Sequence, residues 1–225
     1  IMIKAAIYDL DDLMVNSYAL HTGVDRRLLK DLNYRFSDLP IELKSNFVGK
    51  RVKDIWQEIF SYLKLDIDLE TFYEKRMRLF LEVARNELEI MPGLVESLKL
   101  FKLYNYKIAL ASSAIKPYIN LVLDKFGLRD YFGVIVSGDS VKIGKPHPET
   151  YLVASKRLGY QPEECVVLED AKNGIESAKG AGCKCVAIFN PYTPPQDRSG
   201  ADIVLNSLKE ITIETINSLG ESRRK

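Results

Sequence analysis

Short runs of hydrophobic residues alternate with longer, half-polar segments along most of the chain. Six runs rich in Val, Ile, Leu and Ala are typical of buried parallel strands. They lie at Ile3–Tyr8, Lys107–Ala111, Val134–Val136, Val166–Leu168, Val186–Phe189 and, as an edge strand, Ile203–Leu205. Pro117 and Pro148 each start a helix-like segment, and Gly127 and Gly159 follow these two segments as C-terminal caps. From residue 92 onward the alternation predicts an α/β fold with a doubly wound, mainly parallel sheet.

Residues 18–88 break this alternation, because one helix-like segment follows another without a strand between them. These segments are 19–32, 52–65 and 69–88. In the second segment, hydrophobic residues recur at helical spacing, at Val52, Ile55, Ile59, Tyr62 and Leu63. We therefore predict an α/β core domain at 1–17 and 89–225 and an inserted α-helical cap domain at 18–88. The tail ESRRK, residues 221–225, is predicted to be disordered.

Composition narrows the class of protein. The 225 residues are 46% hydrophobic and 28% charged, as in a soluble globular protein, and 32 Lys and Arg balance 31 Asp and Glu. No basic field is available for nucleic acid or an anionic membrane, so neither is predicted as a partner. No apolar run approaches the roughly 20 residues of a membrane span. The sequence does not indicate an oligomeric state.

Two features of the sequence indicate where the protein is located: the acidic residues after the first strand and the three cysteines. Asp9, Asp11 and Asp12 interrupt the first apolar segment, so we expect no signal peptide. The three cysteines form neither a CxxC pair nor a metal-like cluster and are predicted to be buried thiols, which fits a reducing cytoplasm.

Three carboxylates crowd the four positions that follow the first strand. Like charges this close oppose one another's ionisation, so solvent or a cation must offset the repulsion. Ligands of open α/β sheets gather at the carboxyl ends of the strands. Other polar side chains are predicted at that same edge: Ser112 and Ser113 after the second strand, Glu169 and Asp170 after the fourth, and Lys145 before the helix that follows the third.

This set of groups supports phosphoryl transfer. A carboxylate can attack phosphorus and form an acyl phosphate, and a second carboxylate two residues further along can handle the proton. A divalent ion held by carboxylates offsets the crowded charge and neutralises the phosphate. A lysine and a serine hydroxyl bind the remaining phosphate oxygens. The sequence therefore predicts a magnesium and phosphate site.

Four stretches of the sequence, in order, resemble the motifs of the haloacid dehalogenase-like superfamily. They are DLDDLMVNS, LASSA, GKPHPETY and LEDAKNGIESAKGAG. The resemblance covers nearly the whole chain and is closest to the phosphatases and β-phosphoglucomutases that carry a helical cap on a Rossmann-like core. It implies Asp9 as the nucleophile, Asp11 as the general acid/base, and Ser112 and Lys145 as phosphate ligands. It also implies Mg²⁺ as the cofactor, with Asp9, Asp11, Asp170 and Glu169 on the metal side.

Two positions depart from the pattern of this branch. Asp12 stands where glycine is usual, and Asn16 stands where aspartate is usual. Neither departure removes a group with a direct chemical role. Both are expected to bear on the turn after the first strand and on the hinge of the cap.

Further substrate-binding candidates are Ser113, His21, Lys50 and Arg51. His21 stands at the entry to the cap, where some sugar-phosphate members of the family place a histidine. Lys50 and Arg51, in NFVGKRVKD, lie on a cap loop that would face the core. They either recognise an anionic substrate or form a solvated face.

The sequence leaves three functions in competition. The leading one is a Mg²⁺-dependent phosphatase that hydrolyses a small phosphorylated metabolite, a sugar or polyol phosphate, through an aspartyl phosphate. The alternative is a β-phosphoglucomutase that returns the phosphoryl group to the sugar, which His21 favours. A non-catalytic binding module is disfavoured by the complete set of Asp9, Asp11, Lys145 and Asp170. Halide removal is disfavoured because Asp11 stands where dehalogenases lack an acidic residue.

Overall fold

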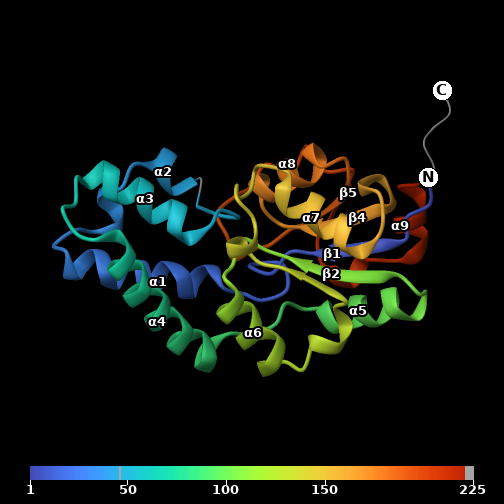
Figure 1. Cartoon of the computed structure of the whole chain (residues 1–225), viewed down its shortest axis with the longest axis horizontal. Helices are drawn as coiled ribbons and strands as arrows, with labels where there is room; N and C mark the ends of the chain where they lie inside the picture. The colour runs from blue at the N-terminus through green and yellow to red at the C-terminus, as the bar shows by residue number, and fades with distance from the viewer. Residues whose placement is uncertain (46, 221–225) are drawn as a thin grey trace.

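A parallel six-stranded sheet forms the centre of the protein. The structure is a computed structural model that describes residues 1–45 and 47–220. The strands lie in the order β3–β2–β1–β4–β5–β6 (Figure 1). They are β1 (Ala5–Tyr8), β2 (Lys107–Ala111), β3 (Val134–Val136), β4 (Cys165–Glu169), β5 (Lys184–Ile188) and β6 (Ile203–Leu205). The prediction of a doubly wound parallel α/β sheet is confirmed.

Helices surround the sheet and extend beyond one end of it. The α-helices are α1 (Tyr18–Asp31), α2 (Ile41–Ser45), α3 (Val52–Leu63), α4 (Leu69–Glu87), α5 (Leu94–Leu103), α6 (Lys116–Lys125), α7 (Glu149–Leu158), α8 (Lys172–Gly180) and α9 (Ile213–Ser218). Short 3-10 helices are η1 (Phe36–Asp38), η2 (Arg129–Tyr131), η3 (Gly138–Ser140), η4 (Pro162–Glu164) and η5 (Leu208–Glu210). Figure 1 shows α7 and α8 on one face of the sheet and α5 and α6 on the other.

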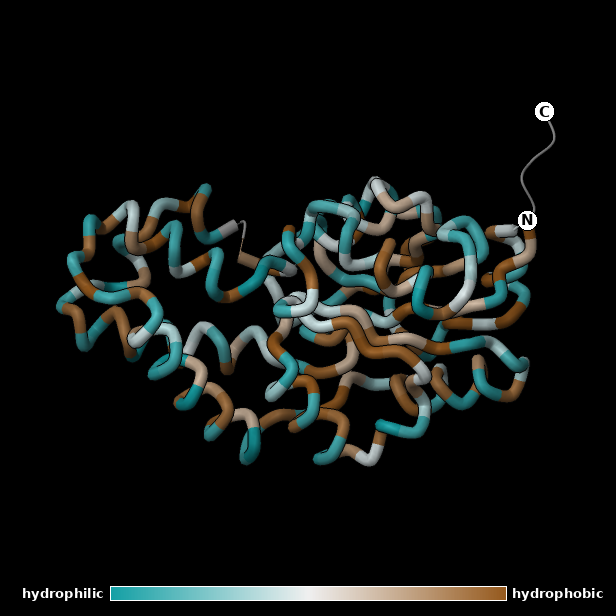
Figure 2. The backbone as a smooth tube through the Cα atoms, in the orientation of Figure 1, coloured by the Kyte–Doolittle hydropathy of each residue, from teal (hydrophilic) through white to brown (hydrophobic). Residues whose placement is uncertain are grey.

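Both faces of the sheet are buried, which explains why its strands are continuous apolar runs. Successive strand residues point to opposite faces. In β1, Tyr8 meets Phe101 of α5 edge-on, with ring centroids 6.1 Å apart, whereas Ile7 belongs to the cluster on the other face that contains Tyr151 of α7. Figure 2 shows the central strands mostly in the brown of hydrophobic residues, between helices of mixed colour.

Helices α1 to α4 follow β1 directly, and their buried side chains join the hydrophobic cluster on one face of the sheet. Trp56 of α3 is fully buried, and its ring lies 4.5 Å from that of Phe72 of α4, measured between centroids. In Figure 1 these four helices lie beyond the end of the sheet that is remote from the chain termini. The boundaries of a separate cap domain at 18 and 88 remain predictions.

Several details differ from the sequence prediction. The first strand begins at Ala5 rather than Ile3, and the fifth spans Lys184–Ile188, so Phe189 lies outside it. Tyr62 was expected on the buried stripe of its helix, but it is 53% exposed. The short helix α2 was not predicted. Each difference falls at the end of an element or in a segment too short to show a periodic pattern.

The lengths of the helices and the C-terminal tail bear on two further predictions. Among the residues that the structure describes, none of the helices has the length and hydrophobicity required to cross a membrane. The tail at 221–225, predicted to be disordered, lies outside the described residues.

Candidate active site

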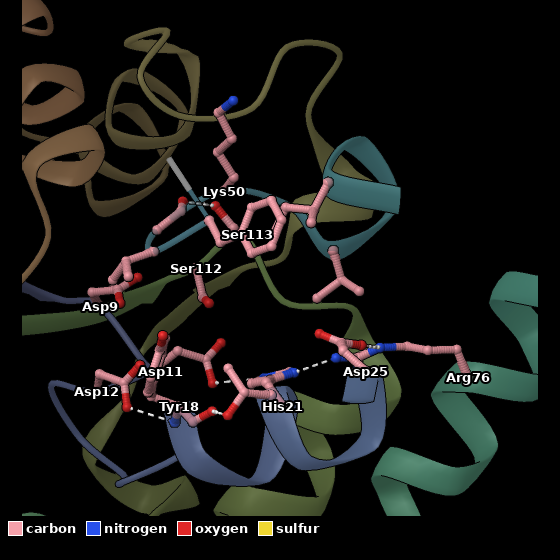
Figure 3. A pocket seen from close by; sticks show the side chains of 16 residues that line it. Asp9, Asp11, Asp12, Tyr18, His21, Asp25, Lys50, Arg76, Ser112 and Ser113 are labelled. Carbon is pink, nitrogen blue, oxygen red and sulfur yellow. Dashed lines mark hydrogen bonds and ion pairs between the residues drawn. The ribbon is translucent and has the colours of Figure 1, made fainter. Parts of the chain in front are cut away.

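Three neighbouring strands end at the same edge of the sheet, and each brings a predicted site residue there. Asp9 follows β1, Ser112 follows β2, and Glu169 is the last residue of β4, with Asp170 after it. The backbone N–H of Asp9 donates to the carbonyl of Leu168 over 3.1 Å, so β1 and β4 remain paired up to the site. Figure 3 shows Asp9 and Ser112 on the same side of a pocket that α1 and α4 help to line.

Lys145 is buried between two carboxylates. Its Nζ lies 2.6 Å from Oδ1 of Asp9 and 2.7 Å from Oε1 of Glu169. Burial by itself would lower the pKa of Lys145, but the charges of Asp9 and Glu169 outweigh burial and raise it. The ammonium group is therefore charged at neutral pH. It fixes one oxygen of Asp9 and leaves the other without a hydrogen bond among the described residues.

Glu169 is held by four donors. Oε1 accepts hydrogen bonds from Lys145 and from the hydroxyl of Tyr151, the latter over 2.6 Å. Oε2 accepts from the backbone N–H groups of Asp170 and Ala171, at 3.0 and 3.2 Å. A Cβ added to Gly174 of α8 would lie 1.7 Å from Oε1, so the close approach of α8 to this carboxylate requires glycine. Glu169 therefore orients Lys145 at the sheet edge.

Asp170 has no partner for its charge within hydrogen-bonding distance. Both of its carboxylate oxygens are buried without a hydrogen bond among the described residues. Burial, and then the charges of Glu169, Asp12 and Asp9, raise the pKa of Asp170 well above its usual range. An unpaired buried carboxylate is costly unless a cation or proton neutralises it. The site thus has two oxygens ready for a ligand that the protein itself does not supply.

The carboxylates at this edge fit a hard divalent cation. Oxygens of Asp9, Glu169 and Asp170 lie within 4.8 Å of one another. Burial raises the pKa of Asp9 to about 8, even though Lys145 acts to lower it. A cation would reverse this shift, and carboxylate oxygens are the ligands that Mg²⁺ prefers. The free oxygens of Asp9 and Asp170 are better placed to bind it than those of Glu169, which already accept four hydrogen bonds.

The Asp11 side chain points away from this carboxylate group. Its Oδ1 accepts from the hydroxyls of Ser17 (2.7 Å) and Tyr118 (3.1 Å) and lies 3.5 Å from Nε2 of His21. Burial acts to raise the pKa of Asp11, but these partners, His21 above all, outweigh it and lower the pKa. The Asp11 carboxylate is therefore ionised and able to accept a proton. Its carboxylate lies outside the group formed by the carboxylate oxygens of Asp9, Glu169 and Asp170. The predicted place of Asp11 on the metal side therefore stays a prediction.

Asp12 shapes the turn between β1 and α1. Its φ of 63° lies in the left-handed region, which glycine adopts at the least steric cost. Its Oδ1 accepts from the backbone N–H groups of Ser17 (3.0 Å) and Tyr18 (2.9 Å), at the start of α1. The carboxylate thus offsets the unpaired donors of the helix N-terminus. The departure from glycine at this position supplies a cap for α1.

The two predicted cap-loop cations are paired with neighbours rather than with the site. Nζ of Lys50 lies 2.9 Å from Glu58, and Figure 3 shows Lys50 directed away from Asp9. Nε of Arg51 lies 2.7 Å from Asp54. Although Lys50 lines the pocket, the structure does not bring either cation together with Asp9.

The same loop rests on the core at three points. The hydroxyl of Ser113 donates to the carbonyl of Gly49 over 2.8 Å, and the side-chain amide of Asn173 donates to the carbonyl of Val48, also over 2.8 Å. A guanidinium nitrogen of Arg51 lies 3.4 Å from the carbonyl of Lys142. Ser113, predicted to bind substrate, therefore anchors the cap loop in this structure.

His21 links the Asp11 side of the site to the helices beyond it. Its ring is stacked on Phe80 with centroids 3.8 Å apart, and its Nδ1 lies 2.8 Å from Nη2 of Arg76. Its other nitrogen faces Asp11. The structure thus places His21 in the pocket with Asp11 and gives it Arg76 as a partner.

Sequence reasoning missed several residues of the site. Tyr151 and Gly174 stand inside two of the motifs given above, so those motifs did carry a signal for them. Asp25 and Arg76 carried none, because each is a single charged residue on an amphipathic helix and they are 51 positions apart.

Comparison with known proteins identifies the family. Residues 6–188 match the family described as haloacid dehalogenase-like hydrolase. The chain belongs to this family. The prediction of an enzyme of the phosphoric monoester hydrolase class is confirmed by this match and by the phosphatases among its relatives.

Three relatives of this hydrolase span most of its length. The phosphorylated carbohydrates phosphatase of Thermotoga maritima is 32% identical over 183 residues, which are 80% of this chain and 82% of the relative. Hexitol phosphatase B of Escherichia coli is 28% identical over 221 residues, 95% and 96% of the two chains. The crystal structure of β-phosphoglucomutase from Clostridium difficile is 25% identical, with a TM-score of 0.83 and 97% of each chain covered.

Proposed function

We propose that this hydrolase is a Mg²⁺-dependent phosphatase that releases phosphate from a small sugar or polyol phosphate through an aspartyl phosphate on Asp9. The observation that carries the proposal is the position of Asp9. One of its oxygens is held by Lys145 at 2.6 Å and the other is free, beside the unpartnered carboxylate of Asp170.

In the proposed reaction Asp9 is the nucleophile and Asp11 transfers the protons. The free oxygen of Asp9 attacks phosphorus and the bond from phosphorus to the alcohol oxygen breaks. The departing alcohol takes a proton from Asp11, which must first take up that proton from solvent because its carboxylate is ionised in the resting site. Water then attacks the phosphorus of the aspartyl phosphate, gives a proton to Asp11, and releases inorganic phosphate and free Asp9. The lowered pKa of Asp11 favours the form that this second step needs. Mg²⁺ bound by Asp9 and Asp170 would neutralise charge on the phosphoryl oxygens.

A cap formed by residues 18–88 would restrict the site to small substrates. The contacts of Ser113 with Gly49 and of Asn173 with Val48 support this, because they hold the cap loop against the core. A covered site excludes macromolecules and bulk water. The partner we propose is therefore a small phosphorylated metabolite and neither a nucleic acid nor a membrane.

Two observations support a sugar or polyol phosphate. The two relatives reported above as phosphatases are named phosphorylated carbohydrates phosphatase and hexitol phosphatase B. The pocket of this chain is lined by hydrogen-bonding side chains beyond the phosphate site, including Thr22, Asp25 and Arg76. A cytoplasmic location is part of the proposal and is supported by three buried, unpaired cysteines.

Metal removal tests the proposal directly. With p-nitrophenyl phosphate or glucitol 6-phosphate as substrate, phosphate release is expected to fall about 10²-fold or more in chelator and to return with added Mg²⁺. Asp170→Asn should need a higher Mg²⁺ concentration for half-maximal activity, whereas Asp139→Asn, at an exposed site on the core, should not. Full activity after metal stripping would contradict the metal requirement.

A mutase remains the second candidate because His21 lies between Asp11 and Arg76, where it could assist proton transfer to a sugar. We expect net phosphate release from sugar or polyol phosphates and no efficient conversion of β-glucose 1-phosphate to glucose 6-phosphate. His21→Ala should reduce phosphate release only modestly, through packing against Phe80. Product analysis with and without a bisphosphate primer distinguishes the two functions. Fast isomerisation that is lost in His21→Ala would favour the mutase.

A further inference from the structure

The side of the pocket opposite Asp9 is lined by charged side chains that the phosphoryl-transfer steps do not use. Figure 3 shows Asp25 of α1 and Arg76 of α4 there, joined to each other. Both are buried: Asp25 is 7% exposed and Arg76 is 0% exposed. Because the phosphate group must lie against Asp9, this opposite side is where the alcohol part of a substrate would lie.

Asp25 uses only one of its two oxygens within the protein. Oδ1 accepts hydrogen bonds from Nε1 of Trp56 over 3.2 Å and from Nε of Arg76 over 3.0 Å. Oδ2 makes no hydrogen bond with any described residue, and Figure 3 shows this oxygen directed toward the interior of the pocket. An ionised carboxylate oxygen has two acceptor sites and no donor. A ligand at this end therefore meets a fixed hydrogen-bond acceptor.

The cations nearby do not offer a matching site for an anion. Each nitrogen of Arg76 is directed at a protein group, namely Asp25, Nδ1 of His21 at 2.8 Å, and Sδ of Met77 at 3.6 Å. Its guanidinium also lies over the ring of Phe80, 5.1 Å from the centroid. Lys50, the other cation among the described lining residues, is paired with Glu58.

We propose that Asp25 determines specificity for the alcohol part of the substrate. Its free oxygen accepts a hydrogen bond from a hydroxyl group remote from the phosphate, and it disfavours substrates that carry a carboxylate or a second phosphate at that position. A site specifies its ligand both by the bond it forms and by the group it repels. The inference rests on the proposed phosphatase function and adds a substrate class to it: monophosphates of polyhydroxy compounds with an uncharged remote end.

The unmodified enzyme provides the first test, with substrate pairs that differ only at the remote end. Glucitol 6-phosphate and 6-phosphogluconate are one pair, and glycerol 3-phosphate and 3-phosphoglycerate are a shorter one. For the pair long enough to reach Asp25, kcat/KM should favour the alcohol by about 10- to 100-fold, the range of one hydrogen bond to a charged group. Equal kcat/KM within both pairs would overturn this inference and leave the proposed function intact. Hydrolysis of none of these phosphates would overturn both.

Asp25→Asn is the second test, because it keeps the shape of the side chain while removing its charge and the second acceptor. The preference for the alcohol within the longer pair should fall about tenfold or more. Turnover of p-nitrophenyl phosphate, which has no hydroxyl for Asp25, is measured alongside so that a general loss of activity is distinguished from a loss of preference. Asp31→Asn, an exposed position on the same helix, is the matched control and should leave the preference unchanged. An unaltered preference in a folded Asp25→Asn protein would overturn the inference. If this variant does not fold, the comparison of substrate pairs on the unmodified enzyme still tests the inference.

Discussion

Replacing Asp9 by Asn is expected to reduce phosphate release by about 10⁴-fold or more, to near the background rate, because an amide cannot replace a carboxylate as the nucleophile. The fold should remain intact. Asn is nearly isosteric with Asp, and its amide oxygen can still accept the hydrogen bond from Lys145 that Oδ1 accepts at 2.6 Å. The substitution also removes one of several buried charges that repel one another, since burial and the neighbouring carboxylates already raise the pKa of Asp9 to about 8. In the absence of Mg²⁺, the melting temperature should therefore stay the same or rise.

Initial rates with p-nitrophenyl phosphate and thermal melts of the same preparations measure these two effects separately. Asp66→Asn, an exposed position in the loop between α3 and α4, is the control and should keep full activity. A phosphate mimic such as beryllium fluoride should attach to the Asp9 carboxylate in crystals of the unmodified enzyme and not in Asp9→Asn. Near-normal turnover in Asp9→Asn would show that the reaction does not pass through an aspartyl phosphate.

The residues of the core site could be predicted because each follows a strand that the sequence shows clearly. The strands are buried on both faces, so they appear as uninterrupted apolar runs, and the first polar residue after each run marks the edge of the sheet. Asp9, Ser112 and Glu169 were placed in this way, with Asp170 next to Glu169. Lys145 was placed by its motif, and the structure adds why it is fixed, through Glu169 and the hydroxyl of Tyr151.

The side-chain directions in the turn and in the cap loop could not be predicted. Asp11 is two residues from Asp9, but its carboxylate accepts hydrogen bonds from Ser17 and Tyr118 and lies outside the group of Asp9, Glu169 and Asp170. Lys50 and Arg51 each form an ion pair with an acidic residue of the next helix. The sequence alone does not show whether such a cation pairs with a nearby carboxylate or with a substrate.

The contact of Asp25 with Arg76 depends on how α1 packs against α4. Amphipathic spacing predicts which face of each helix is buried, but it does not predict which residues meet across the interface. The sequence therefore could not bring Asp25 and Arg76 together, whereas it did bring Asp9 and Ser112 to one edge of the sheet.

The second large effect is expected for Lys145→Ala, which should lower kcat by about 10²- to 10³-fold and also weaken binding of Mg²⁺ or phosphate. The ammonium contacts both Asp9 and Glu169, so its removal leaves two buried carboxylates without their cation. In the reaction the same ammonium would face the phosphoryl oxygens, where a fixed charge stabilises the transition state more than the ground state. A loss in kcat is therefore expected, and not merely a rise in KM.

Two further variants separate the charge of Lys145 from its surroundings. Lys142→Ala removes an exposed lysine from the same loop and should change neither kcat nor KM, which controls for a general loss of positive charge. Glu169→Gln keeps an oxygen that can accept from Lys145 and from Tyr151, but it removes a charge that helps to raise the pKa of Lys145. Its loss in kcat should be smaller, about tenfold, because Glu169 acts through the position of Lys145. An unchanged kcat in Lys145→Ala with only a raised KM would mean that this lysine attracts the substrate and takes no part in the transfer of the phosphoryl group.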